Sequence, residues 1–211
     1  MRNIILTLNV LILILIFGNI ETSALLNRYV MNGSSRCLIK NAKYSNEYLL
    51  SSRHDYELFY DEFNTYYKRK VFTNKIDSTL VKSLKQIVWT LDPIKKETDT
   101  FFLTNNLYKD EHLCATHRHL EMFKLRRRIA LITMDRNILR NSDKCWWRFV
   151  PVRVNNNNSE SNFYLIQNVH YNESLYAASY FFKSAITNAR NVYTWHKKPD
   201  SSQFAWFVNC F

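Results

Sequence analysis

The 211-residue chain has little glycine and proline, with only 2 and 3 of them. This low content excludes a collagen-like chain and argues against a disordered one. The chain also lacks a Gly-rich phosphate loop and the strand-to-helix elbow of serine hydrolases. The paired acids Asp61 and Glu62 fall in an expected loop, where solvation is their ordinary state. We therefore expect neither an enzyme nor a cofactor.

Long apolar runs are also scarce, and only Ile4–Phe17 is of note. Arg2 precedes this run, and Thr22-Ser23-Ala24 supplies small residues at a cleavage position, which is typical of a secretory signal. The run is shorter than the roughly 20 residues that a membrane-spanning helix needs. We predict a signal peptide over residues 1–24 and a soluble, secreted, extracellular protein. The alternative is an uncleaved N-terminal anchor.

The chain has four cysteines, at positions 37, 114, 145 and 210. An even number in a secreted chain favours two disulfides, and four cysteines allow three pairings. No two of them have the spacing of metal ligands. His112, His117 and His119 lie near Arg118 and Glu121 but lack a further ligand at a clear spacing. We expect no metal.

Charge is strongly one-sided, with 29 Lys and Arg against 18 Asp and Glu, a net +11. Such an excess predicts attraction to polyanions, and for an extracellular protein sulfated glycans come before nucleic acid or anionic membranes. The alternative is that the charge only keeps the protein soluble. Ten basic residues cluster around three expected strands: Lys68, Arg69, Lys70, Lys124, Arg126, Arg127, Arg128, Arg190, Lys197 and Lys198.

One motif occurs three times along the chain. It consists of Leu-x-x-Asn, a Tyr, a Glu-x-Leu and then two small residues, and it begins at Leu38, Leu103 and Leu165. The starts are 65 and 62 residues apart. A Trp followed two places later by an apolar residue recurs at Trp89/Leu91, Trp147/Phe149 and Trp206/Val208, with Trp spacings of 58 and 59. Two landmarks with nearly the same period indicate three repeated units.

Each unit contains four short apolar segments of strand length, and Asp92-Pro93 and Pro151 end two of them. The units cover about residues 37–93, 101–151 and 162–211, after a lead-in at 25–35. One four-strand unit cannot bury its Trp and Leu side chains alone. Three such units can bury them against each other and close the sheet, which removes exposed edges. We predict an all-β closed barrel with a hairpin cap; a two-sheet sandwich is the alternative, but it does not explain a threefold period.

The repeated pattern resembles that of the β-trefoil proteins over about residues 36–211. More narrowly, it is similar to secreted insect trefoils, including the C-terminal half of the small moth haemolymph lipoproteins. The segment Phe204–Phe211 resembles the closing strand of these proteins. The chain lacks the helical N-terminal domain of those lipoproteins. It also departs from ricin-type lectins, because Gln86 and Gln203 lie three residues before a Trp instead of two.

The resemblance implies a pairing of the cysteines. The first and last strands of a trefoil are neighbours, so Cys37 is expected to pair with Cys210 and Cys114 with Cys145. The basic residues before the third strand of each unit would then lie at one level of the barrel and form a surface that binds sulfate or phosphate groups. In the alternative, one basic residue per unit, namely Lys70, Arg128 and Arg190, is structural and the others are solvated.

Further features lie in expected loops and turns. Asn32, Asn157 and Asn172 each begin a glycosylation sequon. The segment Arg53–Lys70 is interpreted mainly as a long loop. Its aromatic residues are interleaved with acids and form either a protein-binding surface or packing against the barrel. They are Tyr56, Phe59, Tyr60, Phe63, Tyr66 and Tyr67.

Because a fold does not determine a function, several functions stay open. We expect a secreted, non-enzymatic protein that binds an extracellular glycan or sulfated polyanion, without nucleic acid and without a membrane span. The alternatives are a ligand of a secreted or receptor protein, or a protease inhibitor, acting through its loops, and a carrier or nutrient protein.

Overall fold

The computed structural model describes residues 35–44, 46–61, 64–77, 79, 84–94, 99–119, 126–152, 163–179, 189–196 and 202–211. The predicted signal peptide, the lead-in up to residue 34 and the sequons at Asn32 and Asn157 lie outside these residues. Within them, no helix is long and apolar enough to cross a membrane.

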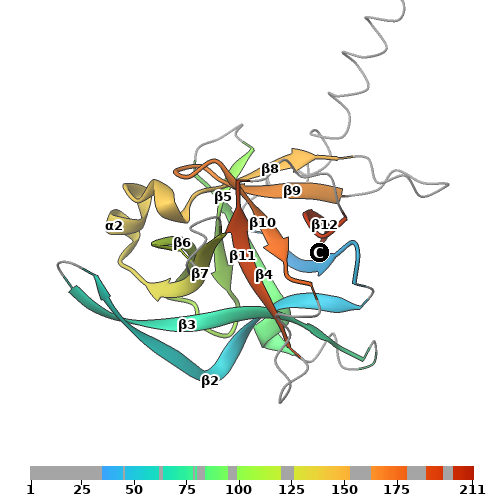
Figure 1. Cartoon of the computed structure of the whole chain (residues 1–211), viewed down its shortest axis with the longest axis horizontal. Helices are drawn as coiled ribbons and strands as arrows, with labels where there is room; N and C mark the ends of the chain where they lie inside the picture. The colour runs from blue at the N-terminus through green and yellow to red at the C-terminus, as the bar shows by residue number, and fades with distance from the viewer. Residues whose placement is uncertain are drawn as a thin grey trace, which may run out of the picture.

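The described chain is all-β, and its twelve strands belong to one antiparallel sheet (Figure 1). Each of the twelve predicted strand segments corresponds to one strand. The strands are β1 (Ser35–Asn41), β2 (Glu47–Asp61), β3 (Asn64–Lys75), β4 (Val88–Pro93), β5 (Thr100–Asn105), β6 (Glu111–His119), β7 (Arg126–Thr133), β8 (Trp147–Pro151), β9 (Phe163–Asn168), β10 (Glu173–Ala177), β11 (Arg190–Trp195) and β12 (Ala205–Cys210).

Six of the strands form a closed antiparallel barrel. The pairs run β1–β4, β4–β5, β5–β8, β8–β9 and β9–β12, and β12 returns to β1. Every strand of this ring therefore has two partners. The closed barrel confirms the coarser part of the predicted fold, an all-β closed barrel, and it leaves no edge along the ring, which is the physical advantage of closure.

The other six strands form three hairpins, β2–β3, β6–β7 and β10–β11. Their second strands also pair with one another, as β3–β7, β7–β11 and β11–β3. We call these three mutually paired strands the cap strands. They bring basic residues that are far apart in the sequence into one sheet.

Two disulfides join distant parts of the chain. Cys37 bonds to Cys210 across the paired strands β1 and β12, and Cys114 bonds to Cys145. This is the pairing that the resemblance to trefoils implied. The Cys37–Cys210 bond closes a separation of 173 residues, and a loop of this length is expected to stabilise the fold by about 3–5 kcal/mol in the chain-entropy model.

The three predicted Trp landmarks lie at one depth. Trp89, Trp147 and Trp206 are each 0% exposed and belong to the same hydrophobic core. Each indole Nε1 donates a hydrogen bond to a Leu carbonyl of the neighbouring hairpin, at 2.7–3.0 Å. A fully buried indole N–H needs such a partner, and here it ties each hairpin to the barrel. The acceptors are the carbonyls of Leu49, Leu113 and Leu175.

Three smaller hydrophobic clusters lie outside the main core, and each is built around one pair of residues. One member of each pair lies two residues before a buried Trp. The indole of that Trp donates a hydrogen bond to a Leu carbonyl, and the other member is the residue directly after this Leu. The pairs are Leu50 with Ile87, Cys114 with Cys145, and Tyr176 with Phe204. An aliphatic contact, a disulfide and an aromatic contact thus occupy corresponding places.

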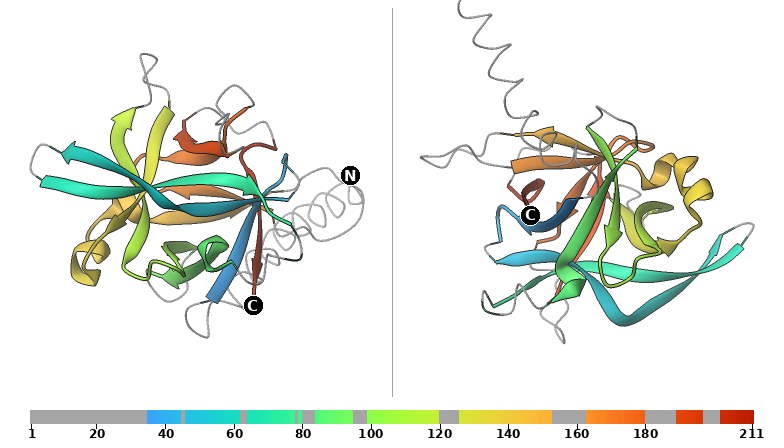
Figure 2. Two further views of the ribbon diagram at one scale, coloured as in Figure 1. Left: turned by 90° about the horizontal axis from the view of Figure 1, so that it is seen from below. Right: turned by 180° about the vertical axis from the view of Figure 1, so that it is seen from behind.

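The hairpin β2–β3 is much longer than the other two. Its strands pair from Glu47–Lys75 to Asp61–Asn64, with an irregularity between Ser51 and Tyr56. It projects well beyond the barrel as a two-stranded ribbon (Figures 1 and 2). The interpretation of Arg53–Lys70 as a long loop is therefore wrong, because this segment lies in β2 and β3.

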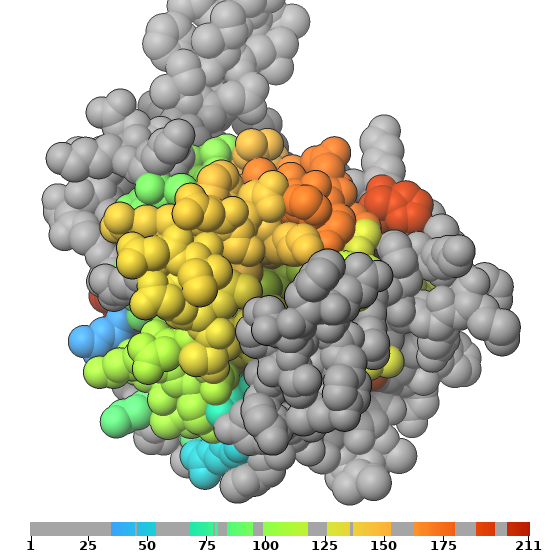
Figure 3. All heavy atoms as spheres, turned by 90° about the vertical axis from the view of Figure 1, so that its left-hand side faces the viewer, coloured from blue at the N-terminus to red at the C-terminus, as the bar shows by residue number. Residues whose placement is uncertain are grey.

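Short helical segments were not predicted. The helix α2 (Arg136–Arg140) begins after Asp135, whose side chain accepts a hydrogen bond from the Asn137 backbone N–H. Single 3₁₀ turns, η1 (Lys85–Ile87) and η2 (Asp143–Cys145), precede β4 and β8. In the space-filling view of Figure 3, the segment that contains α2 forms the middle of that face.

Candidate anion-binding face

The side chains of the cap strands alternate between two faces of the sheet, as strand geometry requires. On one face, Val71, Ile129 and Val192 belong to the barrel core. Two residues before each of them lies an arginine, so Arg69, Arg127 and Arg190 are on the same, inner face. The residues on either side of each arginine belong to the outer face.

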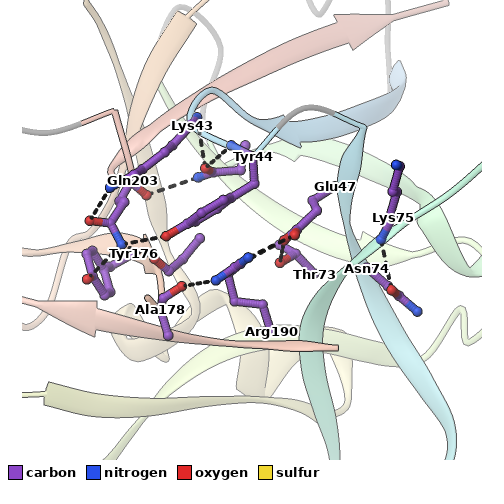
Figure 4. Close-up of polar contacts among 12 residues, drawn as sticks. Lys43, Tyr44, Glu47, Thr73, Asn74, Lys75, Tyr176, Ala178, Arg190 and Gln203 are labelled. Atoms are coloured by element: carbon purple, nitrogen blue, oxygen red, sulfur yellow. Dashed lines mark hydrogen bonds and ion pairs between the residues drawn. The ribbon is translucent and has the colours of Figure 1, made fainter. Parts of the chain in front are cut away.

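The three inner arginines each form a two-pronged ion pair with a buried or nearly buried glutamate. Arg190 donates from Nε and Nη2 to Glu47 at 2.9 and 3.0 Å, and from Nη1 to the carbonyl of Ala178 at 2.8 Å (Figure 4). Arg69 makes the same fork with Glu111, and Arg127 with Glu173. Parallel forks of this kind combine charge with strict geometry.

A tyrosine covers each guanidinium. The Arg–Tyr pairs, with the distance from Cζ to the ring centroid, are Arg69–Tyr108 at 3.3 Å, Arg127–Tyr171 at 3.4 Å and Arg190–Tyr44 at 3.4 Å. The Tyr and Glu of each set come from one repeated motif, and the Arg comes from another. Burial raises the pKa of the Tyr44 hydroxyl, although the nearby Arg190 charge partly opposes this shift.

These contacts remove three residues from the predicted binding surface. Arg69, Arg127 and Arg190 are 2–7% exposed and hold their donors on Glu carboxylates and backbone carbonyls, so they cannot also grip a ligand from outside. The alternative prediction, that one basic residue per unit is structural, is right for Arg190. It is wrong by one position elsewhere, because Arg127 and Arg69, and not Arg128 and Lys70, have this role.

The three ion pairs leave the charge excess unchanged. Taking them away removes 3 of the 29 basic and 3 of the 18 acidic residues, so 26 and 15 remain and the net charge is still +11. The whole excess must therefore be carried by other parts of the molecule.

The outer face of two cap strands carries four further basic residues. Lys68 and Lys70 flank Arg69 in β3, while Arg126 and Arg128 flank Arg127 in β7. Lys70 is exposed and the two arginines are half-buried, whereas Lys68 is only 3% exposed. Because Lys70 pairs with Ala130, two residues from Arg128, the two strands bring these cations together. We call Lys70, Arg126 and Arg128 the basic face.

The third cap strand differs at the corresponding positions. Ala189 and Asn191 flank Arg190, so β11 adds no charge to the basic face. It adds aromatic residues instead, since Tyr193 pairs with Arg128 and Trp195 pairs with Arg126. The remaining predicted residues, Lys124, Lys197 and Lys198, lie outside the described residues.

A polar network supports the aromatic side of this region. The Gln203 side-chain Nε2 donates to the hydroxyls of Tyr44 and Tyr176 at 3.0 and 2.9 Å and to the carbonyl of Ala177 at 3.0 Å (Figure 4). Lys43 Nζ donates to Gln203 Oε1 at 3.3 Å. The network holds Tyr176, whose ring contacts Trp195, in one orientation.

Other predicted features have ordinary surroundings. The His112 ring is buried, and its Nδ1 lies 2.8 Å from the Thr104 hydroxyl. His117 is exposed, and among the described residues no group of three His, Cys, Asp or Glu could hold a metal ion. Asn172 is an exposed turn residue at φ 52°, and its Oδ1 accepts a hydrogen bond from Gln167.

No protein-family model and no curated protein matches the chain. Solved structures do. A Culex salivary protein of the Cysteine and Tryptophan-Rich (CWRC) family covers 83% of this chain and 93% of its own, at 16% identity and a TM-score of 0.53. A Caenorhabditis elegans protein of unknown function and the SDF2-like protein of Arabidopsis thaliana both reach a TM-score of 0.59, at 15% and 11% identity. They cover 83% of this chain and 93% and 92% of their own.

At these identities the similarity concerns the fold alone. It fits the closed all-β barrel described above, and it assigns no ligand to the basic face.

The division of the basic residues between the two faces and the role of Trp195 were not predicted from the sequence. The signal for the first was available, because an Arg lies two residues before a Val or Ile in all three units, as Arg69/Val71, Arg127/Ile129 and Arg190/Val192. Residues two apart in a strand share a face, which places these three arginines with the core residues. No sequence signal pointed to Trp195, because its pairing with Arg126 depends on contact between two hairpins.

Proposed function

We propose that the chain is a β-trefoil of three equivalent four-strand units that is secreted and binds a sulfated extracellular glycan without catalysing a reaction. The closed barrel, the three hairpins and the recurrence of the Trp and Arg–Glu–Tyr contacts support the trefoil. The two disulfides and the predicted signal peptide support secretion, since disulfides persist in oxidising compartments.

The observation that carries the binding function is the separation of basic residues on the cap strands. The inner arginines are used in ion pairs, while the basic face gathers Lys70, Arg126 and Arg128 on the outer side of adjoining strands. The net charge of +11 is entirely outside the ion pairs and draws a polyanion toward the molecule. Neighbouring cations on one face suit the repeated oxyanions of a sulfated sugar chain.

The test is chromatography on immobilised heparin with increasing salt. The wild-type protein is expected to elute above physiological salt, and a K70N/R126A/R128N variant at clearly lower salt. These replacements are the residues that the chain itself has at the corresponding places in β11, Ala189 and Asn191, so the fold should tolerate them.

A control variant distinguishes binding at the basic face from attraction by the net charge of the whole molecule. It also removes three positive charges, from exposed residues on other elements: Lys85, Lys109 and Arg140, each changed to Ala. The control is expected to elute close to wild type. Elution of the wild type below physiological salt, or equal shifts for both variants, would refute binding at the basic face.

A second candidate function is binding of a protein partner through the ribbon of β2 and β3. Residues 54–67 contain four acids and six Tyr or Phe but no Lys or Arg. The described part of this segment, residues 54–61 and 64–67, projects beyond the barrel (Figure 2). A projecting aromatic, acidic ribbon suits a basic protein surface. A variant without residues 54–67 would keep its heparin elution but lose a partner captured by the full chain.

A further inference from the structure

One contact on the basic face differs in kind from the others. Arg126 and Trp195 are paired across β7 and β11, and the Arg126 guanidinium carbon lies 4.8 Å from the centroid of the Trp195 ring. Both side chains are half-buried. A cation held against an indole in this way gains electrostatic attraction and loses freedom to turn.

The indole is itself fixed from its other sides. The Trp195 ring meets Tyr176 edge to face, with centroids 5.2 Å apart and an interplanar angle of 80°, and lies 6.1 Å from Phe204 at 30°. Phe204 is 2% exposed, and the Tyr176 hydroxyl accepts a hydrogen bond from Gln203. Arg126 therefore rests on a rigid aromatic base, not on a mobile surface residue.

The corresponding position at another junction of the cap strands has a different pair of residues. Lys68 lies at the place of Arg126 in β3, and its cross-strand partner is Ile132. In the third strand this place is held by Ala189, which has no charge. Of the cross-strand pairs at this place among the described residues, the pair of β7 with β11 combines a guanidinium with an aromatic ring.

The position of the Arg126 guanidinium against Trp195 affects how its N–H donors can bind a ligand. A guanidinium carries its N–H donors in one plane and in a fixed fork that matches two oxygens of an oxyanion. An ammonium group in the same place would supply charge without this fork. Arg128 is two residues away on the same face of β7 and can share a second pair of oxygens.

We propose that Arg126, oriented by Trp195, is the residue of the basic face that recognises a sulfate ester group, with Arg128 as its neighbour. This inference rests on the proposed function, since it names the group by which a sulfated glycan is recognised. It predicts that the identity of the cation at position 126 matters, whereas at Lys70 only the charge matters.

The test uses substitutions that keep the charge. Titration calorimetry of the full secreted protein with a heparin oligosaccharide is expected to show about tenfold weaker binding for Arg126→Lys, because the planar fork held against Trp195 is lost. Lys70→Arg is expected to bind within about twofold of wild type. Trp195→Phe, which keeps an aromatic ring in the cluster, should fall between them, and near-ultraviolet circular dichroism checks that each variant retains its packing.

Two further ligands show whether the group that Arg126 recognises is a sulfate, a carboxylate or a phosphate. Desulfated heparin, which retains its carboxylates, is expected to bind much more weakly than heparin and to be insensitive to Arg126→Lys. Equal binding of desulfated heparin would overturn the sulfate assignment. Equal or tighter binding of polyphosphate, with the same dependence on Arg126, would reassign the site to phosphate and also overturn it.

The outcomes separate the two proposals. If the wild-type protein does not bind heparin, the proposed function fails. If it binds and Arg126→Lys binds equally well, the proposed function stands and the role of Arg126 is refuted.

Discussion

The buried ion pairs allow one substitution to be compared at three similar sites. Glu47, Glu111 and Glu173 each accept two hydrogen bonds from a buried arginine. Changing Glu to Gln keeps the side-chain volume and removes the charge. Because the arginine is then left without a counter-charge in the interior, each change should lower the free energy of unfolding by several kcal/mol, about 3–5 for a well-buried pair.

The three sites are not expected to respond equally. Glu47 also accepts a hydrogen bond from the Thr73 hydroxyl at 2.8 Å, and Glu173 from that of Thr194 at 2.6 Å. For Glu111 the corresponding residue of β7 is Leu131, which has no donor, and the Glu111 side chain is 14% exposed, against 10% and 7% for Glu47 and Glu173. We expect the change at Glu111 to cost about 1–2 kcal/mol less, because at the other two sites a Thr hydrogen bond to a charged group, worth about 1.5–3 kcal/mol, becomes a neutral one worth about 0.5–1.5 kcal/mol.

Denaturant unfolding with the disulfides intact measures this order, provided that the slope against denaturant is unchanged. Thr73→Val should cost about 1–2 kcal/mol and bring the effect of Glu47→Gln close to that of Glu111→Gln. As a control, Asp99→Asn breaks the exposed pair with Arg148 and should cost less than about 1 kcal/mol. A largest loss at Glu111, or losses below about 1 kcal/mol at all three sites, would refute the reasoning.

Three more predictions concern packing and pH. Ser51→Ala should raise the free energy of unfolding by about 1 kcal/mol, because the Ser51 hydroxyl is buried and has no hydrogen-bond partner; a lower melting temperature would contradict this. Replacing Cys114 by Leu and Cys145 by Ile, which copies the aliphatic pair at the corresponding place, should retain the native circular dichroism spectrum, whereas replacing both by Ala should destabilise the protein further. Burial raises the pKa of Tyr164 above its ordinary 10.0. Its contribution to stability is therefore complete below pH 10 and is lost as the pH rises through the folded-state pKa, so Tyr164→Phe should unfold less readily at alkaline pH in a pH titration followed by fluorescence.

Much of the fold could be predicted from the sequence because the repeat is carried by residues with fixed structural tasks. Asn41, Asn105 and Asn168 show this well. Each side-chain Nδ2 donates to a carbonyl just before the barrel strand that pairs with its own strand, and each Oδ1 accepts backbone N–H groups of its own turn. A residue that closes a turn and anchors a second segment recurs wherever this structure recurs, so its spacing is visible in the sequence.

The ribbon and the basic face could not be predicted in the same way. Residues 54–67 are rich in aromatic and acidic residues, a composition that suits a loop as well as a hairpin, and only the pairing of β2 with β3 decides between them. Net charge and clustering in the sequence do not show which of the basic side chains are buried and which are exposed. The difference between Arg127, which is ion-paired with Glu173, and Arg126, which rests on Trp195, follows from contacts between hairpins far apart in the chain.

The order in which the ion pairs connect the repeats has a consequence for chain connectivity. Arg69 holds a glutamate of the second repeat, Arg127 one of the third, and Arg190 returns to Glu47 in the first. The backbone N–H of Phe211 donates to the carbonyl of Arg36 beside the Cys37–Cys210 bond. The described ends are thus adjacent members of a cycle, and a circular permutant that joins them and opens the chain between β8 and β9 should preserve every one of these interactions.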